Sequence, residues 1–98
     1  MKVLRRPQFL SDLEEGADYL FTEAGEDVVL RWKAAIKSTT KLLRKYPQLG
    51  RVRADLPMPG VRSVNLKSFS NWIVFYRVGK RHVELLRVKH GMMHLPEL

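Results

Sequence analysis

Cysteine is absent from this 98-residue chain, so disulfide bonds and thiolate chemistry are excluded. No apolar run approaches the roughly 18 residues that a membrane-spanning helix needs, and the first residues lack the long apolar stretch of a signal peptide. Histidine is scarce, and His82, His90 and His94 do not have convincing metal-ligand spacing. We therefore expect a cytoplasmic protein with no metal, no cofactor and no membrane partner.

Acidic residues are also scarce, and their placement is uneven. The formal net charge is +8; residues 1–49 hold nine Lys or Arg against seven acids, and residues 50–98 hold nine against three. Every acid of the first half lies between Asp12 and Asp27, and no further acid occurs before Asp55. The pattern fits an acidic helix beside a basic helix, each with a solvated face. It fits equally a basic surface that attracts an acidic protein segment or a nucleic acid.

The length predicts a single domain, residues 1–98, with one small core. Residues 2–6 carry β-branched and long side chains and predict an edge strand. Pro7 suits the first turn of a helix, and Gly25 allows the chain to turn at its end. Between them, apolar or small residues recur at helical spacing: Phe9, Leu13, Gly16, Ala17, Leu20 and Ala24.

A second helix is predicted to begin at Glu26 and Asp27, whose charges favour a helix N-terminus, and to stop at Pro47. The short link at Gly25 implies an antiparallel helical hairpin. Residues 47–60 are rich in proline and glycine and predict a loop. Three strands are expected after it, at 61–69, 72–78 and 82–90, with turns at Ser70-Asn71 and Gly79-Lys80-Arg81. The fold class is α+β, with the order β-αα-βββ and the hairpin packed on one face of an antiparallel sheet.

Each predicted C-terminal strand carries an arginine, and the last ends at His90. Arginine forks on a rigid sheet suit phosphate or carboxylate recognition, and His90 could act as a general acid or base. Simple hairpin pairing places Arg62 and Arg77 near one end of the sheet and Arg87 toward the other, near Ser68 and Phe69. Alternatively, these arginines pair at strand ends with Asp55, Glu84 or the C-terminal carboxylate, and His90 is a surface residue.

Other polar and aromatic residues favour structural roles. Asp12, Glu15 and Asp18 fit a solvated helix face better than a catalytic set. We expect Trp32 and Trp72 to lie in the core rather than in contact with a partner protein. No Gly-rich phosphate loop or nucleophile elbow is present in the sequence.

The chain resembles the type II toxins of the RelE/ParE superfamily, and most closely the ParE, or plasmid stabilisation, branch. The similarity covers nearly the whole chain, and the order and spacing of its pieces carry it. Those pieces are Leu42-Leu43, Tyr46-Pro47-Gln48-Leu49-Gly50, Gly60-Val61-Arg62, Phe75-Tyr76-Arg77-Val78 and Leu86-Arg87-Val88-Lys89-His90-Gly91.

The resemblance implies a bacterial toxin that inhibits DNA gyrase and is neutralised by a cognate antitoxin in a hetero-oligomer, and that is not a hydrolytic enzyme. Arg62, Arg77, Arg87 and His90 are the candidate target-binding residues. The alternative is a ribosome-dependent mRNA endonuclease, for which Arg77, Arg87 and His90, with Lys67, would be catalytic. Ribonuclease members place an arginine early in the strand where this chain has Ile73. A third possibility is a non-toxic antitoxin-binding module of the same fold.

The resemblance also implies where the antitoxin binds. In this family the antitoxin lays a helix, and often a strand, along the toxin. An acidic disordered segment would therefore fold onto apolar residues at the edge of the apolar stripe of each toxin helix. The candidate contacts are Leu10, Phe21, Val29 and Trp32.

Overall fold

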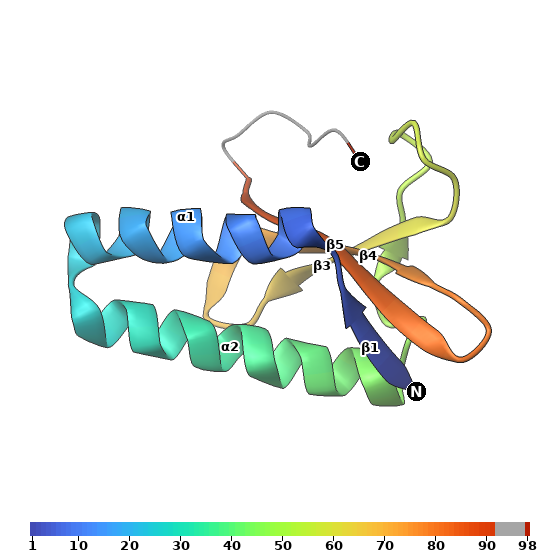
Figure 1. Cartoon of the computed structure of the whole chain (residues 1–98), viewed down its shortest axis with the longest axis horizontal. Helices are drawn as coiled ribbons and strands as arrows, with labels where there is room; N and C mark the ends of the chain where they lie inside the picture. The colour runs from blue at the N-terminus through green and yellow to red at the C-terminus, as the bar shows by residue number, and fades with distance from the viewer. Residues whose placement is uncertain (92–97) are drawn as a thin grey trace.

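The computed structural model describes residues 1–91 and residue 98 of the chain. In the sequence, two long helices follow the first strand and precede the other strands; in space, the first strand joins the others in one sheet (Figure 1). In chain order the elements are β1 (Lys2–Arg5), α1 (Pro7–Ala24), α2 (Glu26–Lys45), β2 (Arg51–Val52), β3 (Val61–Leu66), β4 (Phe69–Val78) and β5 (His82–His90). The predicted α+β class, the helical hairpin and the three C-terminal strands are confirmed.

The helix boundaries follow from local chemistry. Pro7 occupies the first helical position of α1, where its missing N–H leaves no hydrogen bond unmade. Gly25, with a φ of 90°, donates its N–H to the carbonyls of Leu20 and Phe21 and ends the helix. The same glycine precedes α2, which carries acids in its first turn and the bases Arg44 and Lys45 in its last.

The five strands form one sheet in the order β1-β5-β4-β3-β2. Strands β2 to β5 pair antiparallel, but β1 pairs parallel to β5, so the sheet is mixed and not purely antiparallel. The parallel pairing is possible because the helical hairpin and the intervening strands separate β1 from β5 in sequence. β1 is an edge strand, as predicted.

Two details of the predicted strands are wrong. The turn between β3 and β4 lies at Lys67-Ser68, not at Ser70-Asn71, because Ser68 adopts a φ of 68° and lets Phe69 pair directly with Leu66. The predicted loop also contains β2, a two-residue strand that pairs with the start of β3. The turn at residues 79–81 is confirmed.

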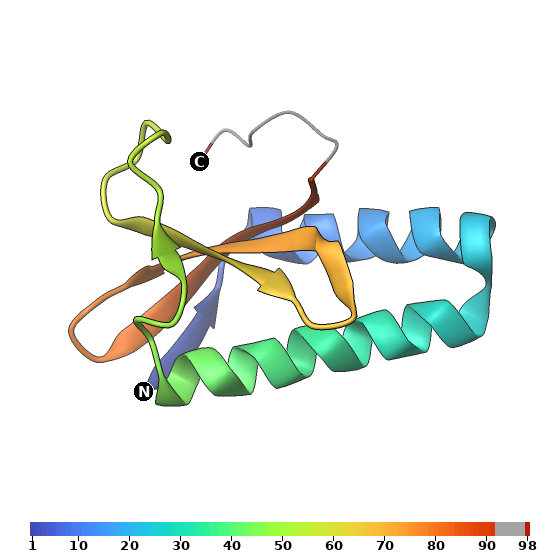
Figure 2. The same cartoon turned by 180° about the vertical axis from the view of Figure 1, so that it is seen from behind.

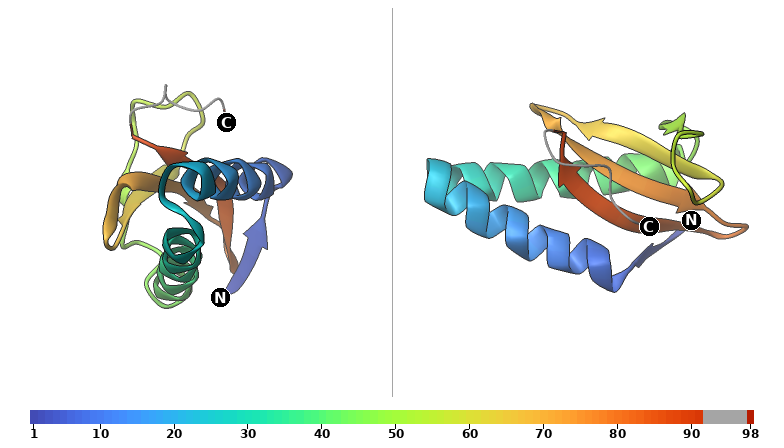
Figure 3. Two further views of the ribbon diagram at one scale, coloured as in Figure 1. Left: turned by 90° about the vertical axis from the view of Figure 1, so that its left-hand side faces the viewer. Right: turned by 90° about the horizontal axis from the view of Figure 1, so that it is seen from above.

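The sheet has an apolar layer on each face. The main core lies between the helices and the sheet, and its largest buried members are Phe9, Trp32, Leu43, Leu66, Trp72 and Tyr76. A smaller cluster forms from Leu56, Val61, Phe75 and Leu86, with Met58, Ile73 and Leu98 packed against it. Figure 2 shows α1 behind the strands and α2 below them, and the left panel of Figure 3 shows the two helices side by side. In the described part of the chain, no helix is long and apolar enough to cross a membrane.

Candidate functional site

Trp32 of α2 lies at the centre of the contact between the helical hairpin and the sheet. Its side chain is 0% exposed, and its ring meets the ring of Trp72 edge-on at 5.0 Å between centroids. A Cβ atom at Gly16 of α1 would lie 2.6 Å from Trp32 Cη2. Glycine is therefore required at position 16, because any side chain there would collide with the indole. Both tryptophans are core residues, as predicted.

The four predicted antitoxin contacts separate into two pairs. Leu10 and Phe21 are 49% and 62% exposed on α1 and offer apolar surface to a partner. Val29 and Trp32 are buried in the core, because the phase of α2 turns them toward the sheet. Only Leu10 and Phe21 lie on a surface that a partner can contact without displacing the core.

An open groove of about 750 Å³ runs along α1 beside Leu10. Its lining combines apolar and charged residues: Leu10, Ser11, Leu13, Glu14, Ala17, Asp18 and Lys33. Because Lys33 belongs to α2, the groove lies between the two helices. An amphipathic helix could place apolar side chains against Leu10, Leu13 and Ala17 and polar ones beside the charged residues.

Arg62 holds a loop in place and does not extend from a strand end. Its Nη1 donates to the carbonyl of Gly50 at 2.7 Å and to that of Gln48 at 3.3 Å. The buried Tyr76, its register partner on β4, donates its hydroxyl to Pro47 O at 2.8 Å and accepts the Gly50 N–H at 2.7 Å. Burial raises the pKa of the Tyr76 hydroxyl above its usual value of 10.0. Arg62 and Tyr76 thereby fix the segment that follows α2 against the sheet.

Arg77 pairs across the β4–β5 ladder with Glu84. The distance from Arg77 Nη2 to Glu84 Oε1 is 2.9 Å, and Arg6 Nε lies 4.0 Å from the other carboxylate oxygen. The expected pairing of a strand-end arginine with Glu84 is confirmed for Arg77. Its side chain is nevertheless 41% exposed, so it can reach a partner as well.

Arg87 is bound by a buried acid of the first helix. Asp12 is 4% exposed, and its carboxylate accepts Arg87 Nε at 2.8 Å and Nη2 at 3.0 Å. It also accepts the Val88 backbone N–H at 3.1 Å and lies 3.1 Å from Lys89 Nζ. The predicted solvated role of Asp12 is wrong, because this carboxylate satisfies the β5 edge where β1 has ended. The signal was present in the sequence: Asp12 is three residues after Phe9 and four before Gly16, on the apolar face of α1.

The predicted position of Arg87 is also wrong. Arg87 lies opposite Phe75, because β4 begins at Phe69 and not at Trp72 and because a bulge between Phe75 and Tyr76 shifts the β4–β5 register by one residue. Phe69 is six residues away along β4, at the start of the strand. Arg87 therefore lies beside the middle of β4 and not near Ser68 and Phe69.

The three residues of the ribonuclease alternative do not gather at one place. His90 is opposite Trp72, and the two rings meet edge-on at 5.3 Å between centroids. Arg77 is five residues from Trp72 along β4, which is about 17 Å at the usual rise of an antiparallel strand. Lys67 lies in the β3–β4 turn and lines a separate hollow with Arg31. Arg87 points to Asp12, so these side chains do not converge on one phosphate-sized site.

Arg53 is buried on the face of the sheet away from the helices, where it binds several neighbouring groups. It donates Nε and Nη2 to the two carboxylate oxygens of Asp55 at 2.9 and 2.8 Å, and Nη1 to Ser63 Oγ at 3.1 Å. Its guanidinium also lies 5.3 Å from the Phe75 ring centroid. The hydrogen bond to Arg53 lowers the pKa of the exposed Asp55 carboxyl from 3.8 to about 2. No sequence motif marks Arg53, because its partners are set by the turn that follows β2.

Metal ligation finds no support in the described residues. Within residues 1–91 and 98, no group of three His, Cys, Asp or Glu side chains is placed to hold an ion. His94, four residues after His90 in the sequence, lies outside the described residues.

The described fold is a helical hairpin packed on one face of a five-stranded mixed sheet. Eleven chains of solved structures match this chain. One is from a structure titled "Chromosomal ParDE TA system from P. aeruginosa", with a TM-score of 0.76 and 22% identity over 92% of this chain and 95% of that one. No curated protein matches.

The sequence identifies the family. Residues 3–95 match the family described as ParE toxin of type II toxin-antitoxin system, parDE. The match covers almost the entire length, and the chain belongs to the ParE toxin family. The predicted superfamily and branch are confirmed.

Proposed function

We propose that this chain is the toxin of a type II toxin–antitoxin module, that it inhibits DNA gyrase, and that a cognate antitoxin neutralises it. Membership of the ParE toxin family supports the toxin role. Gyrase inhibition is what that family membership implies for the target.

The observation that carries the choice of gyrase over mRNA cleavage is the pairing of Arg87 with Asp12. Cleavage by the RNA 2′-hydroxyl needs a base and cations that face one phosphate. Here Arg87 is bound to a carboxylate, and Arg77 and His90 lie at different points along the β4–β5 ladder. Ile73, where ribonuclease members carry an arginine, packs against the small apolar cluster on the other sheet face. A toxin that acts by binding, without hydrolysis, needs no such convergence.

For the antitoxin, the groove between α1 and α2 is the proposed docking surface. Leu10 lines this groove, and Phe21 extends the exposed apolar surface along the same helix. A disordered acidic segment that folds into a helix here would bury both side chains beside Lys33. Val29 and Trp32 would support that surface from below and would not touch the partner.

Purified toxin added to gyrase and relaxed plasmid, with no antitoxin present, tests the target. We expect supercoiling to fall as toxin concentration rises, and to recover when the product of the neighbouring gene is added. The double variant Leu10→Asp/Phe21→Asp should leave inhibition of gyrase intact and prevent that recovery. The control is the double variant Leu4→Asp/Val52→Asp, which adds the same charge at other exposed apolar positions. Unchanged supercoiling at a large molar excess of folded toxin would contradict the proposal. Codon-positioned cuts in ribosome-bound mRNA would favour the ribonuclease alternative.

A further inference from the structure

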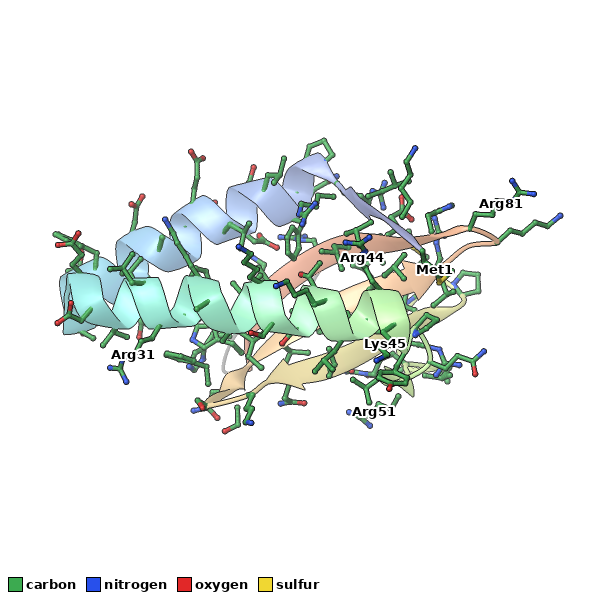
Figure 4. The ribbon with its side chains drawn as sticks, turned by 90° about the horizontal axis from the view of Figure 1, so that it is seen from below. Met1, Arg31, Arg44, Lys45, Arg51 and Arg81 are labelled. Carbon is green, nitrogen blue, oxygen red and sulfur yellow. The ribbon has the colours of Figure 1, made fainter. Side chains whose placement is uncertain are left out.

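A cluster of positive side chains lies where β1 meets the C-terminal half of α2. They surround a solvent-open cavity of about 350 Å³, which we call the basic cavity, lined by Lys2, Val3, Arg5, Lys37, Thr40, Lys41 and Arg44. Five of these seven residues are Lys or Arg, and none is acidic. Figure 4 shows Arg44 beside Met1 on this part of the molecule, where Arg44 Nε donates to the Met1 carbonyl at 3.1 Å.

No carboxylate of the described residues forms an ion pair with these five cations. Within residues 1–91 and 98, every ion pair uses other bases, namely Arg6, Arg53, Arg77, Arg87 and Lys89. Glu84, the one acid on β5, is held by Arg77 and Arg6. Between Asp27 and Asp55 the sequence has no acid, so α2 offers no carboxylate near the cavity. Concentrating like charge without partners costs folding free energy, which points to a ligand that supplies the opposite charge.

Helix stability does not explain the cluster. Positive charge stabilises the C-terminal end of a helix only within the last turn, which accounts for Arg44 and Lys45. Lys37 lies two turns earlier, and Lys2 and Arg5 belong to a strand. A shared anionic ligand explains why β1 and α2 both present positive side chains to the same cavity.

The spacing of the cations suits a phosphate backbone. Lys37, Lys41 and Arg44 follow one another at intervals of four and three residues, on one face of α2. They span about 10 Å of helix axis, at 1.5 Å per residue, which is close to the rise of three nucleotides along the DNA axis at about 3.4 Å each. The cavity floor is small, with Val3 and Thr40 as its only uncharged members. A protein helix would need larger apolar anchors, which lie instead in the groove beside Leu10.

We propose that the basic cavity binds the phosphate backbone of double-stranded DNA. The choice of DNA rests on the proposed function, because gyrase holds a DNA duplex while it acts. The toxin would thereby contact the gyrase–DNA complex through the DNA as well as through the enzyme. The contacts are with phosphates alone and carry no sequence preference.

Fluorescence anisotropy of a labelled duplex, titrated with the full chain across a series of salt concentrations, tests this site. The cavity variant is Lys37→Gln/Lys41→Gln/Arg44→Gln. The control, Arg31→Gln/Arg51→Gln/Lys67→Gln, removes the same charge from exposed residues outside the cavity. Figure 4 shows Arg31 toward the opposite end of α2 from Arg44. All six side chains are exposed, so both variants should fold.

We expect the cavity variant to bind the duplex at least about tenfold more weakly, and its salt slope to fall by about 0.9 for each phosphate that the protein no longer neutralises. The control should keep most of the affinity. Equal losses of affinity in both variants would show attraction by net charge alone and would overturn the site. A polyglutamate peptide or a hairpin RNA that binds more tightly than the duplex, through the same three residues, would overturn the choice of DNA.

A supercoiling assay on the same proteins separates this inference from the proposed function. If the unaltered chain inhibits gyrase but does not bind the duplex, the DNA site is wrong and the gyrase proposal stands. If the chain binds the duplex through the cavity but leaves gyrase active, the gyrase proposal is wrong and the site stands.

Discussion

Asp12 of α1 accepts two hydrogen bonds from the guanidinium of Arg87, 75 residues later in the chain, at 2.8 and 3.0 Å. The same carboxylate accepts the backbone N–H of Val88 and pairs with Lys89. One buried acid therefore joins the first helix to the last strand at the point where that strand loses its neighbour β1. The pair also removes Arg87 from the set of cations that could act on a phosphate.

Replacing Asp12 by Asn should destabilise the fold by about 3 kcal/mol, because the change removes a buried carboxylate that pairs with Arg87 and Lys89 and accepts the Val88 N–H. Urea unfolding followed by tryptophan fluorescence measures the loss. Asp18→Asn, at an exposed acid on the same helix, is the matched control and should change stability by less than about 0.5 kcal/mol. Equal effects of the two changes would contradict the role assigned to Asp12.

Gly16→Ala tests the packing of the helical hairpin, because the sign of its effect is diagnostic. Alanine favours a helix over glycine by about 1 kcal/mol, so an unpacked site would become more stable. Here the new Cβ would lie 2.6 Å from Trp32 Cη2 and 3.2 Å from Trp72 Cη2. We expect a net loss of about 1–3 kcal/mol in the free energy of unfolding. A rise in thermal stability would show that the indoles do not pack against α1 in this way.

Tyr76→Phe should release the segment that follows α2. The change removes one acceptor from the Gly50 N–H and one donor from Pro47 O, at a cost of about 1–3 kcal/mol. Amide hydrogen exchange should rise at Gly50 more than elsewhere. Tyr46→Phe, at an exposed tyrosine close by in the sequence, is the control. Unchanged exchange at Gly50 would contradict the anchoring role of the hydroxyl.

Asp55 predicts a specific acid sensitivity. Because its pKa falls from 3.8 to about 2 in the folded chain, the folded state holds a proton on this carboxyl less tightly than the unfolded state does. Its contribution to stability is therefore fully present above about pH 4 and is lost as the pH falls toward about 2. The difference in stability between the unaltered chain and Asp55→Asn should shrink over that window. A difference that stays constant with pH would show that Arg53 does not stabilise the ionised form.

Much of the fold could be predicted because its signals are local. The spacing of apolar residues, Pro7 and Gly25 defined the helices without reference to the rest of the chain. The turn at Lys67-Ser68 was missed because strand register decided it, and Ser-Asn two residues later carried a stronger turn signal. The parallel pairing of β1 depends on where the hairpin returns the chain, which no local pattern records.

The site was harder to predict, because its residues are defined by partners far away in the sequence. Arg62, Arg77 and Arg87 look alike on successive strands, yet one binds loop carbonyls, one binds Glu84 and one binds Asp12. The bulge after Phe75 changed the register that simple pairing assumes. The burial of Val29 depends on how α2 is rotated about its axis relative to the sheet, and the spacing of apolar residues alone does not fix that rotation.

Induced expression in a bacterium that lacks the neighbouring gene, with labelled precursor uptake into DNA and into protein followed over time, tests the central claim most directly. The proposed gyrase toxin should stop DNA synthesis first, produce filamentous cells, and leave early protein synthesis intact. Early loss of protein synthesis with continued DNA synthesis, or unimpaired growth despite confirmed folded toxin, would contradict the claim.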